Sequence, residues 1–358
     1  MTPPPDAPVS QSATTVADCL IEIRGLKTHF FTDEGVVRAV DGVDLDVRRG
    51  RTLCVVGESG SGKSITARSI LQIVDDPGRI VAGSIMYRRT DAEPVDIATL
   101  HPRRATIRAI RGREIAMIFQ EPMSALSPVH TIGNQIVEGI RLHLRVTKEE
   151  AHDRAVSFLG RVGIPKPETR MESYPFQLSG GMRQRAMIAM ALSCGPSLLI
   201  ADEPTTALDV TTQANILDLI QDLQAEFGMT VMFITHDLGV VAEIADDVAV
   251  MYLGMVVERG DVDAVFHDPK HPYTRALLRS IPRMGARSGA RLEAIRGMVP
   301  HPFARPTGCP FHTRCQEAMP GVCATIVPPR ESLAPGRDVR CLLHSDVERL
   351  ERAQRVAP

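Results

Sequence analysis

The fold of this 358-residue chain is decided by the stretch Leu53-Cys54-Val55-Val56-Gly57-Glu58-Ser59-Gly60-Ser61-Gly62-Lys63-Ser64. Its first four residues predict a buried strand, the next eight fit the phosphate-loop pattern G-x-x-x-x-G-K-S/T, and a helix is expected over residues 64–73. In such a loop, glycines let backbone N–H groups converge on a β-phosphate, and the helix N-terminus adds a favourable dipole. A glycine-rich turn without a ligand is the alternative.

Lys63 is expected to neutralise phosphate oxygens, and the Ser64 hydroxyl is expected to ligate Mg²⁺. The loop as a whole predicts that ATP is bound by Gly57, Ser59, Gly60, Ser61, Gly62, Lys63 and Ser64.

Composition places the chain among ordinary globular proteins. The apolar fraction is 44% and the charged fraction 23%, and a net charge of −2 gives no electrostatic case for nucleic acid as a partner. No run approaches the roughly 18 apolar residues that a membrane-spanning helix needs. Residues 1–18 are rich in Pro and Ser and predict a disordered tail. We therefore expect a cytosolic chain that reaches a membrane only through partners.

Short apolar runs predict further strands at residues 115–119, 198–201, 231–234 and 248–252. Continuous runs of this length, separated by helical patterns, suit a mostly parallel sheet that is buried on both faces. Residues 20–55 alternate more openly and contain Asp-Gly and Arg-Gly turns, as antiparallel strands would.

Helical periodicity dominates residues 131–144, 148–162 and 180–192, which predicts a helical insertion over about residues 122–195. After Gly260, Pro and Gly become frequent and strand patterns fade. The expected fold is therefore an α/β phosphate-loop ATPase domain at residues 19–265 with an antiparallel β subdomain. A small irregular C-terminal extension would follow at 266–345, and a tail at 346–358.

A second motif is the apolar run at residues 198–201, which ends in Asp202 and Glu203. The carboxyl ends of parallel strands form the crevice in which such sheets bind ligands. Beside a phosphate loop, Asp202 is expected to hold Mg²⁺ through water, and Glu203 to act as general base on the attacking water. Taken alone, two acidic residues after a strand would more often begin an ordinary loop.

A third motif, Leu178-Ser179-Gly180-Gly181-Met182-Arg183-Gln184-Arg185, resembles the signature sequence of ABC ATPases. Its serine and glycines at the start of a helix offer a second anion site, although an ordinary helix cap is the alternative. The resemblance implies two motor domains arranged head to tail. Each ATP would lie between the phosphate loop of one domain and Ser179, Gly181 and Gln184 of the other.

Further positions follow the order of that family. Gln120 resembles the glutamine that senses Mg²⁺ and the attacking water and links to the membrane subunits. Ala207-Leu208-Asp209 resembles the loop that crosses the dimer interface, and His236 resembles the histidine that contacts the γ-phosphate. In this family an aromatic residue some twenty-odd positions before the phosphate loop stacks on adenine. Phe30 and Phe31 are the candidates, and Phe31 is preferred.

The C-terminal part resembles the extension of oligopeptide, dipeptide and nickel importer ATPases, on the basis of residues 271–278 (HPYTRALL) and 308–315 (GCPFHTRC). Four cysteines follow the spacing C-x5-C-x7-C-x17-C. The resemblance implies that a 4Fe–4S cluster is bound by Cys309, Cys315, Cys323 and Cys341. A zinc site and four free thiols remain alternatives. The other cysteines, Cys19, Cys54 and Cys194, are expected to be buried apolar residues.

Together these resemblances imply the ATP-hydrolysing motor subunit of a membrane ABC importer at the cytoplasmic face. Peptides are the leading cargo, and a nickel or other small-solute importer and an ABC exporter are the alternatives. The implied partners are a second ABC ATPase (a copy or a homologue), two permeases and, indirectly, an extracytoplasmic solute-binding protein. A soluble ABC protein of DNA repair or translation is a further alternative. Such proteins commonly carry a coiled coil or a second motor domain, and the sequence indicates neither.

Overall fold

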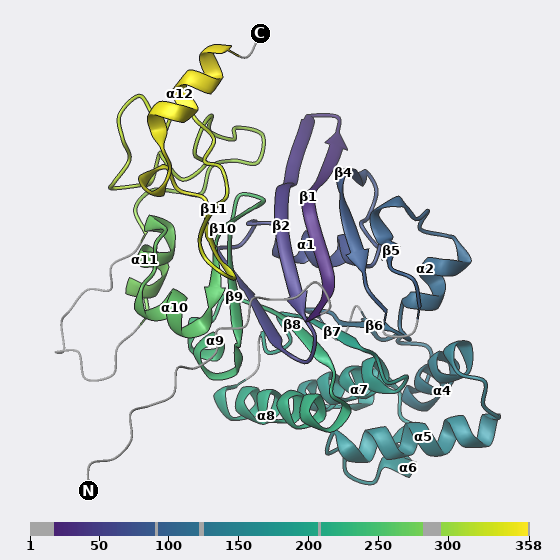
Figure 1. Ribbon diagram of the computed structural model, residues 1–358. Helices are drawn as coiled ribbons and strands as arrows, with labels where there is room; N and C mark the ends of the chain where they lie inside the picture. The colour runs from purple at the N-terminus through teal and green to yellow at the C-terminus, as the bar shows by residue number, and fades with distance from the viewer. Residues whose placement is uncertain (1–17, 90–91, 122–124, 207–208, 282–294, 357–358) are drawn as a thin grey trace, which may run out of the picture.

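A computed structural model describes residues 18–89, 92–121, 125–206, 209–281 and 295–356. In Figure 1, the helix α1 (Lys63–Ile70) lies behind a small antiparallel sheet, the central strands of a large mixed sheet lie below it, and a layer of helices lies at the bottom. The phosphate loop runs directly into α1, so it lies between the two sheets.

The small sheet has the strand order β2-β1-β4-β5 and is antiparallel throughout. Its strands are β1 (Cys19–Thr32), β2 (Gly35–Arg48), β4 (Gly78–Tyr87) and β5 (Val95–Asp96). In β2 the alternate residues Val43, Leu45 and Val47 are buried, because successive side chains of a strand point to opposite faces. The antiparallel strands predicted within residues 20–55 are therefore confirmed.

The large sheet has the order β11-β12-β10-β9-β3-β8-β7-β6, and the strands from β9 to β6 are parallel. Its central strands are β3 (Thr52–Val56), β6 (Ile115–Ile118), β7 (Leu198–Asp202), β8 (Thr230–Thr235) and β9 (Asp247–Tyr252). In β3, Leu53 and Val55 pack toward the small sheet, and Cys54 and Val56 pack toward the helical layer. Because both faces of the sheet are covered, its strands are continuous apolar runs, as the sequence predicted.

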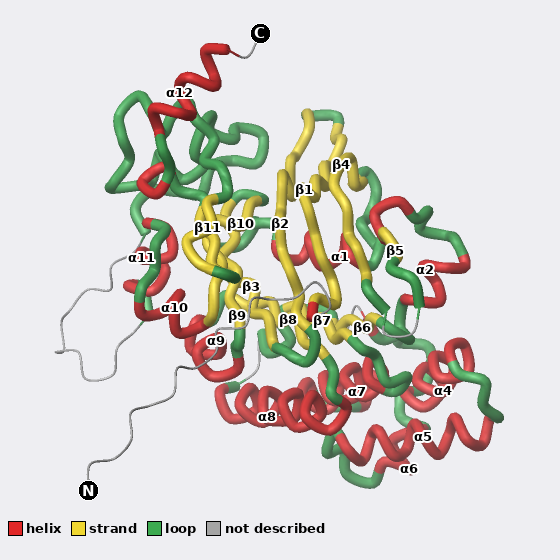
Figure 2. Tube along the Cα trace, viewed as in Figure 1, coloured by secondary structure: helices red, strands yellow, loops and turns green. Residues whose placement is uncertain are grey.

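The helical layer lies below the large sheet in Figures 1 and 2. It contains α4 (Ile132–His143), α5 (Lys148–Arg161), α6 (Pro167–Met171), α7 (Gly180–Leu192) and α8 (Val210–Phe227). The predicted helices at 131–144, 148–162 and 180–192 agree with α4, α5 and α7 to within one residue at each end. Among the described residues, no helix has the length and apolar character required to cross a bilayer.

Shorter helices complete the domain: α2 (Ala105–Ile110), α9 (Leu238–Ile244), α10 (Val262–His267), α11 (Pro272–Arg279) and α12 (Val347–Val356). The C-terminal part also contributes strands to the large sheet, which the sequence pattern did not indicate. β12 (Arg337–Val339) pairs with β10 (Met255–Asp261), and β11 (Glu331–Ala334) pairs with β12. Phe311 and Ile326 join the same apolar cluster as the helical layer. The extension is therefore built onto the motor domain.

His271 fixes the start of α11 in this arrangement. It is 1% exposed, its Nδ1 accepts a hydrogen bond from the Tyr273 N–H (3.0 Å), and its own N–H donates to Glu258 Oε2 (2.8 Å). Burial lowers the pKa of His271 to about 3. The imidazole is therefore neutral in the folded protein.

This burial predicts a loss of stability in mild acid. The unfolded chain protonates His271 below about pH 6.5, but the folded chain does not, so the unfolded state binds more protons and stability falls as pH falls. Between pH 7.5 and 5, His271 should remove about 2 kcal/mol from the free energy of unfolding. His271→Asn should abolish this part of the pH dependence in denaturant titrations, and the exposed His267→Asn serves as control. Identical pH profiles for wild type and His271→Asn would contradict the prediction.

Candidate nucleotide-binding and hydrolysis site

The phosphate loop is held tightly beneath β2. Gly62 has φ 99°, and a Cβ at this position would lie 2.4 Å from the carbonyl oxygen of Ala39. Only glycine meets both conditions. The Lys63 ammonium donates to the carbonyl oxygens of Gly57 (2.8 Å) and Glu58 (3.1 Å). Burial lowers the pKa of Lys63, and the nearby carboxylates of Glu203, Asp202 and Glu58 oppose that shift.

Ser64 and Asp202 provide oxygen ligands next to the loop. The Ser64 hydroxyl donates to Asp202 Oδ1 over 2.9 Å, which joins the start of α1 to the end of β7. Burial raises the pKa of the Asp202 carboxyl group. A hydroxyl and a carboxylate are the hard ligands that Mg²⁺ prefers, so this pair fits the predicted cation. Mg²⁺ bound there would neutralise phosphate charge.

Glu203 contacts three other side chains of the site. Its Oε2 accepts hydrogen bonds from Gln120 Nε2 (3.1 Å) and from the Thr206 hydroxyl (3.1 Å), and its Oε1 lies 3.3 Å from His236 Nδ1. Its backbone is left-handed, with φ 47°, which is a strained conformation for a residue other than glycine. A carboxylate fixed in this way is suited to accept a proton from water. The predicted Gln120, Glu203 and His236 do come together, whereas Thr206 was not predicted.

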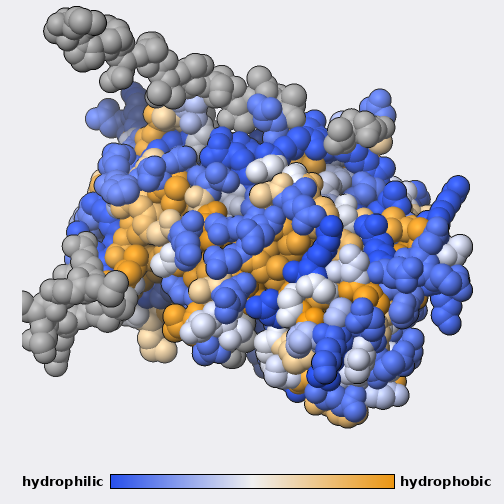
Figure 3. Space-filling model, turned by 90° about the horizontal axis from the view of Figure 1, so that it is seen from below, coloured by the Kyte–Doolittle hydropathy of each residue, from blue (hydrophilic) through white to orange (hydrophobic). Residues whose placement is uncertain are grey.

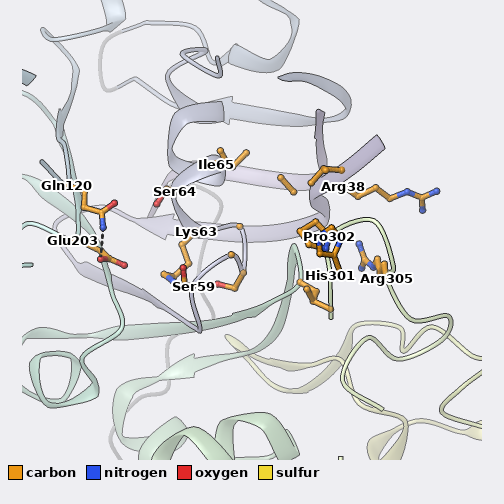
Figure 4. A pocket seen from close by; sticks show the side chains of 16 residues that line it. Arg38, Ser59, Lys63, Ser64, Ile65, Gln120, Glu203, His301, Pro302 and Arg305 are labelled. Atoms are coloured by element: carbon orange, nitrogen blue, oxygen red, sulfur yellow. Dashed lines mark hydrogen bonds between the residues drawn. The ribbon is translucent and has the colours of Figure 1, made fainter. Parts of the chain in front are cut away.

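One pocket of about 320 Å³ is lined by the phosphate loop, Gln120 and Glu203. In Figure 4, Gln120 and Glu203 lie at one end, Ser59, Lys63 and Ser64 lie in the middle, and Arg38, His301, Pro302 and Arg305 lie at the other end. The last three belong to the C-terminal extension and were not predicted, since no local motif marks them.

The aromatic residues expected to stack on adenine lie elsewhere. Phe31 is not among the residues that line the pocket, and its ring carries the Arg79 guanidinium at 4.3 Å from the ring centroid. Phe30 packs against the start of β4, where a Cβ on Gly78 would be 2.6 Å from its ring. Neither ring lines the pocket beside the phosphate loop, so the structure does not support the expectation that Phe31 stacks on adenine.

The signature segment begins α7 as expected. The Ser179 hydroxyl accepts a hydrogen bond from the Met182 N–H (3.3 Å), and Ser179 is exposed. Gln184, in contrast, is buried and donates to the carbonyl oxygen of Pro204 (2.5 Å). It therefore binds the loop that follows Glu203. None of Ser179, Gly181 and Gln184 lines the chain's own nucleotide pocket.

The predicted interface loop is described only at Asp209, which caps α8 by accepting hydrogen bonds from the Thr212 N–H (3.0 Å) and hydroxyl (2.7 Å). Ala207 and Leu208 lie outside the described residues.

The C-terminal extension is hydrogen-bonded to the phosphate loop at Glu58. Two nitrogens of the Arg314 guanidinium donate to the Glu58 carboxylate (2.6 and 3.0 Å), and the Glu58 N–H donates to the Tyr273 hydroxyl oxygen (2.9 Å). The Arg314 side chain is 4% exposed and its guanidinium lies over the Tyr252 and Phe311 rings. A bidentate pair in a buried setting is strong and directional.

We predict that Arg314→Ala lowers the free energy of unfolding by about 2 kcal/mol and weakens ATP binding, because Glu58 loses its counter-charge beside the loop. Arg275→Ala removes an exposed pair with Glu317 and should cost less than about 1 kcal/mol. Denaturant unfolding and calorimetric ATP titration measure both effects. A double-mutant cycle with Glu58→Gln that gives no coupling energy would contradict the assignment.

The four C-terminal cysteines are neighbours. Burial raises the pKa of Cys309 to about 12 and that of Cys341 to about 11, and charge on Cys315 or Cys323 would raise both further. Within the described part of the chain, however, no three His, Cys, Asp or Glu side chains are arranged to hold a metal ion. The four thiols lie near one another, and the expected 4Fe–4S cluster stays a prediction. Cys19 and Cys54 are buried as expected, and Cys194 is half-buried.

A phosphate loop, a serine–aspartate pair and a fixed glutamate at the ends of parallel strands define a phosphate-loop nucleoside triphosphatase. Comparison with known families refines this class. Residues 40–206 match the family model described as ABC transporter, and residues 257–323 match the one described as Oligopeptide/dipeptide transporter, C-terminal region. The chain belongs to the ABC transporter family, in the group that carries this C-terminal region. The resemblance inferred from the motifs is confirmed.

Curated relatives span nearly the whole chain. A putative peptide import ATP-binding protein of Brucella melitensis is 50% identical over 92% of this chain and 98% of its own length. The oligopeptide transport ATP-binding protein AppD of Bacillus subtilis is 50% identical over 91% of this chain and 97% of its own. The dipeptide transport ATP-binding protein DppD of Escherichia coli is 45% identical over 90% and 96%.

Solved structures confirm the cassette fold. A dimeric bacterial ABC transporter cassette has a TM-score of 0.60 at 27% identity, covering 68% of this chain and 98% of that one. A post-hydrolysis dimer of an ATP-binding cassette bound to ADP and Pi has a TM-score of 0.59 at 26% identity, with the same coverage.

Proposed function

We propose that this chain is the ATP-hydrolysing motor subunit of an ABC importer for peptides, bound to permeases at the cytoplasmic face of the membrane. One observation carries the proposal: the oligopeptide/dipeptide-type C-terminal region is joined to the phosphate loop through Arg314 and Tyr273. The names of the relatives, which describe peptide, oligopeptide and dipeptide transport, point to the same cargo.

Within the site, the phosphate loop and Lys63 bind the triphosphate. Ser64, Asp202 and Gln120 are the residues that would hold Mg²⁺. Glu203 takes a proton from the attacking water, since its carboxylate is oriented by Gln120, Thr206 and His236. His236, which lies next to the same carboxylate, would contact the γ-phosphate.

The exposed start of α7 supports a dimeric arrangement. Ser179 and Gly181 present a helix N-terminus that lies outside the chain's own pocket, so their anion partner is the γ-phosphate of an ATP on a second motor chain. That chain is either another copy or a homologue, and Asp209 would lie at the interface. Solved cassettes of the same fold are dimers.

A groove beside Gln120 is the proposed contact with a permease. It has a volume of about 300 Å³ and runs between β6 and the helices α4 and α7. Its lining is largely apolar and includes Met117, Phe119, Met187, Met190 and Ala191. Apolar patches separated by polar residues are visible on the underside of the molecule in Figure 3. A short amphipathic helix from a permease would bury the groove, and closure of the motor dimer would move it.

A separate proposal concerns the ligand of the four C-terminal cysteines. The proximity of Cys309, Cys315, Cys323 and Cys341 supports a shared ligand, of which a 4Fe–4S cluster is the first candidate and zinc the second. Iron, zinc and acid-labile sulfide should be measured on anaerobically purified protein. About four iron atoms per chain would support the cluster. A chain with neither metal would leave four free thiols and end this proposal.

Transport is tested by reconstituting the chain with its permeases and solute-binding protein in proteoliposomes. The motor chain and ATP are inside the lumen, and the binding protein is outside. We expect accumulation of a labelled peptide mixture in the lumen that depends on ATP and on the binding protein, and peptide-stimulated phosphate release. Uptake of nickel in place of peptide, or movement in the opposite direction, would overturn the peptide-import proposal.

A further inference from the structure

Residues 301–305 of the C-terminal extension form one end of the nucleotide pocket. Figure 4 shows His301, Pro302 and Arg305 beside Arg38, across the phosphate loop from Gln120 and Glu203. More than two hundred residues separate this segment from the loop in sequence. Its position therefore depends on how the extension packs against β2.

The segment is fixed to β2 and to its hairpin turn. Arg305 donates to Asp41 Oδ2 over 2.8 Å, and the Arg305 side chain is 20% exposed. The Phe303 ring lies 3.5 Å from the position a Cβ on Gly35 would occupy, so it covers the turn between β1 and β2. The His301 carbonyl accepts the Ala304 N–H (2.8 Å), which makes the segment a compact turn. These contacts hold His301 and Pro302 at the pocket.

The orientation of a bound nucleotide follows from the two ends of the pocket. Ser64, Asp202 and Glu203 gather where the terminal phosphate must react. The carbonyl of Ala39 lies close to Gly62, so β2 and the loop are in contact in the middle of the pocket. The sugar and base therefore extend in the other direction, past Arg38, toward His301 and Pro302. An imidazole, a proline ring and a guanidinium all present flat or apolar surfaces on which a nucleobase stacks.

We propose that His301 and Pro302, beside Arg38, form the base-binding end of the ATP site, in place of the Phe31 ring. The proposal rests on the proposed ATPase function. It makes the C-terminal extension a direct part of the nucleotide site, which would give ATP affinity a dependence on how this extension is folded. The ligand is the purine base of the same nucleotide whose phosphates the loop holds.

The test compares two ligands on two matched alanine variants. Dissociation constants for Mg–ATP and for Mg–tripolyphosphate, which lacks sugar and base, are measured by calorimetry. His301→Ala should weaken ATP binding about tenfold and leave tripolyphosphate binding unchanged, because only stacking on the base is lost. Phe31→Ala should leave both constants unchanged, and His301→Phe should restore ATP binding.

An unchanged ATP affinity in His301→Ala would overturn the proposal, as would a loss confined to Phe31→Ala. Equal losses for ATP and tripolyphosphate would also overturn it, because the effect would then lie at the phosphate end. These outcomes differ from a failure of the proposed function, in which the wild-type chain would bind neither ligand.

Discussion

Glu203→Gln should lower the rate of ATP hydrolysis by about 10²–10⁴-fold, whereas Mg–ATP should still bind with nearly wild-type affinity. The amide has the shape of the carboxylate and can keep contacts with Gln120 and Thr206, which lie 3.1 Å from Glu203 Oε2. It cannot accept a proton from water. The phosphate loop, Ser64 and Asp202 are untouched, so the ground-state complex remains. Phosphate release and calorimetric titration of the same preparation separate the two effects.

The matched control is Glu243→Gln, which neutralises an exposed carboxylate on α9, outside the nucleotide pocket. It should leave both turnover and affinity unchanged. If Glu203→Gln hydrolysed ATP at the wild-type rate, Glu203 would not be the general base. If its affinity for Mg–ATP fell as far as its turnover, Glu203 would act in binding instead of in the chemical step.

The hydrolytic end of the site could be predicted because each of its residues follows a strand that is recognisable by itself. Gln120, Glu203 and His236 come just after β6, β7 and β8, and these strands are neighbours in the sheet. Parallel neighbours bring their carboxyl ends to one edge, so the strand pattern together with the family resemblance placed three distant residues together. The phosphate loop is likewise a continuous stretch with its own strand and helix.

The base end could not be predicted, because it is made by contacts between segments far apart in sequence. The expectation for Phe31 relied on its distance from the phosphate loop along the chain, and the path of the β1–β2 hairpin sends its ring toward Arg79 instead. His301 and Pro302 reach the pocket through the Arg305–Asp41 ion pair. An ordinary arginine and aspartate carry no signal of such a pairing in the sequence.

Parts of the C-terminal extension also could not be predicted from the sequence. β12 contains the charged residues Arg337 and Asp338. The sequence pattern therefore did not indicate a strand here, although all three residues of β12 are buried. Both residues are neutralised by partners, Arg337 by Glu258 and Asp338 by Arg330.

Gln184 was placed at the dimer interface by resemblance, but its side chain binds the Pro204 carbonyl within the chain. Charge pairs and buried amides are fixed by tertiary structure, so residue type alone does not locate them.

Two variants of this chain that are inactive alone should hydrolyse ATP when they are mixed. Lys63→Ala removes the cation of the phosphate loop. Gly181→Asp places a carboxylate at the start of α7, where the γ-phosphate of the partner's ATP would lie. A Cβ on Gly181 meets only the Thr212 methyl group at 3.4 Å, so the fold has room for a side chain, and the expected effect is charge repulsion. In a symmetric dimer of either variant, both ATP sites are defective, so each variant alone should lose nearly all activity.

A mixed dimer retains one intact site, which combines the phosphate loop of the Gly181→Asp chain with the α7 N-terminus of the Lys63→Ala chain. If chains pair at random, half of the dimers are mixed and each has one working site, so about a quarter of the wild-type activity should return. The control is a mixture of Lys63→Ala with Glu203→Gln. Lys63 and Glu203 line the same pocket of one chain, so neither mixed site is complete and no activity should return.

The two mixtures therefore separate a shared site from a site contained in one chain. Restoration by Gly181→Asp but not by Glu203→Gln requires that ATP contact both chains at once. The absence of restoration in both mixtures would contradict the shared site for two copies of this chain, and the same substitutions divided between this chain and a homologous ATPase would then test the mixed pair. Restoration in both mixtures would show that Lys63 and Glu203 act on different nucleotides, contrary to their common pocket.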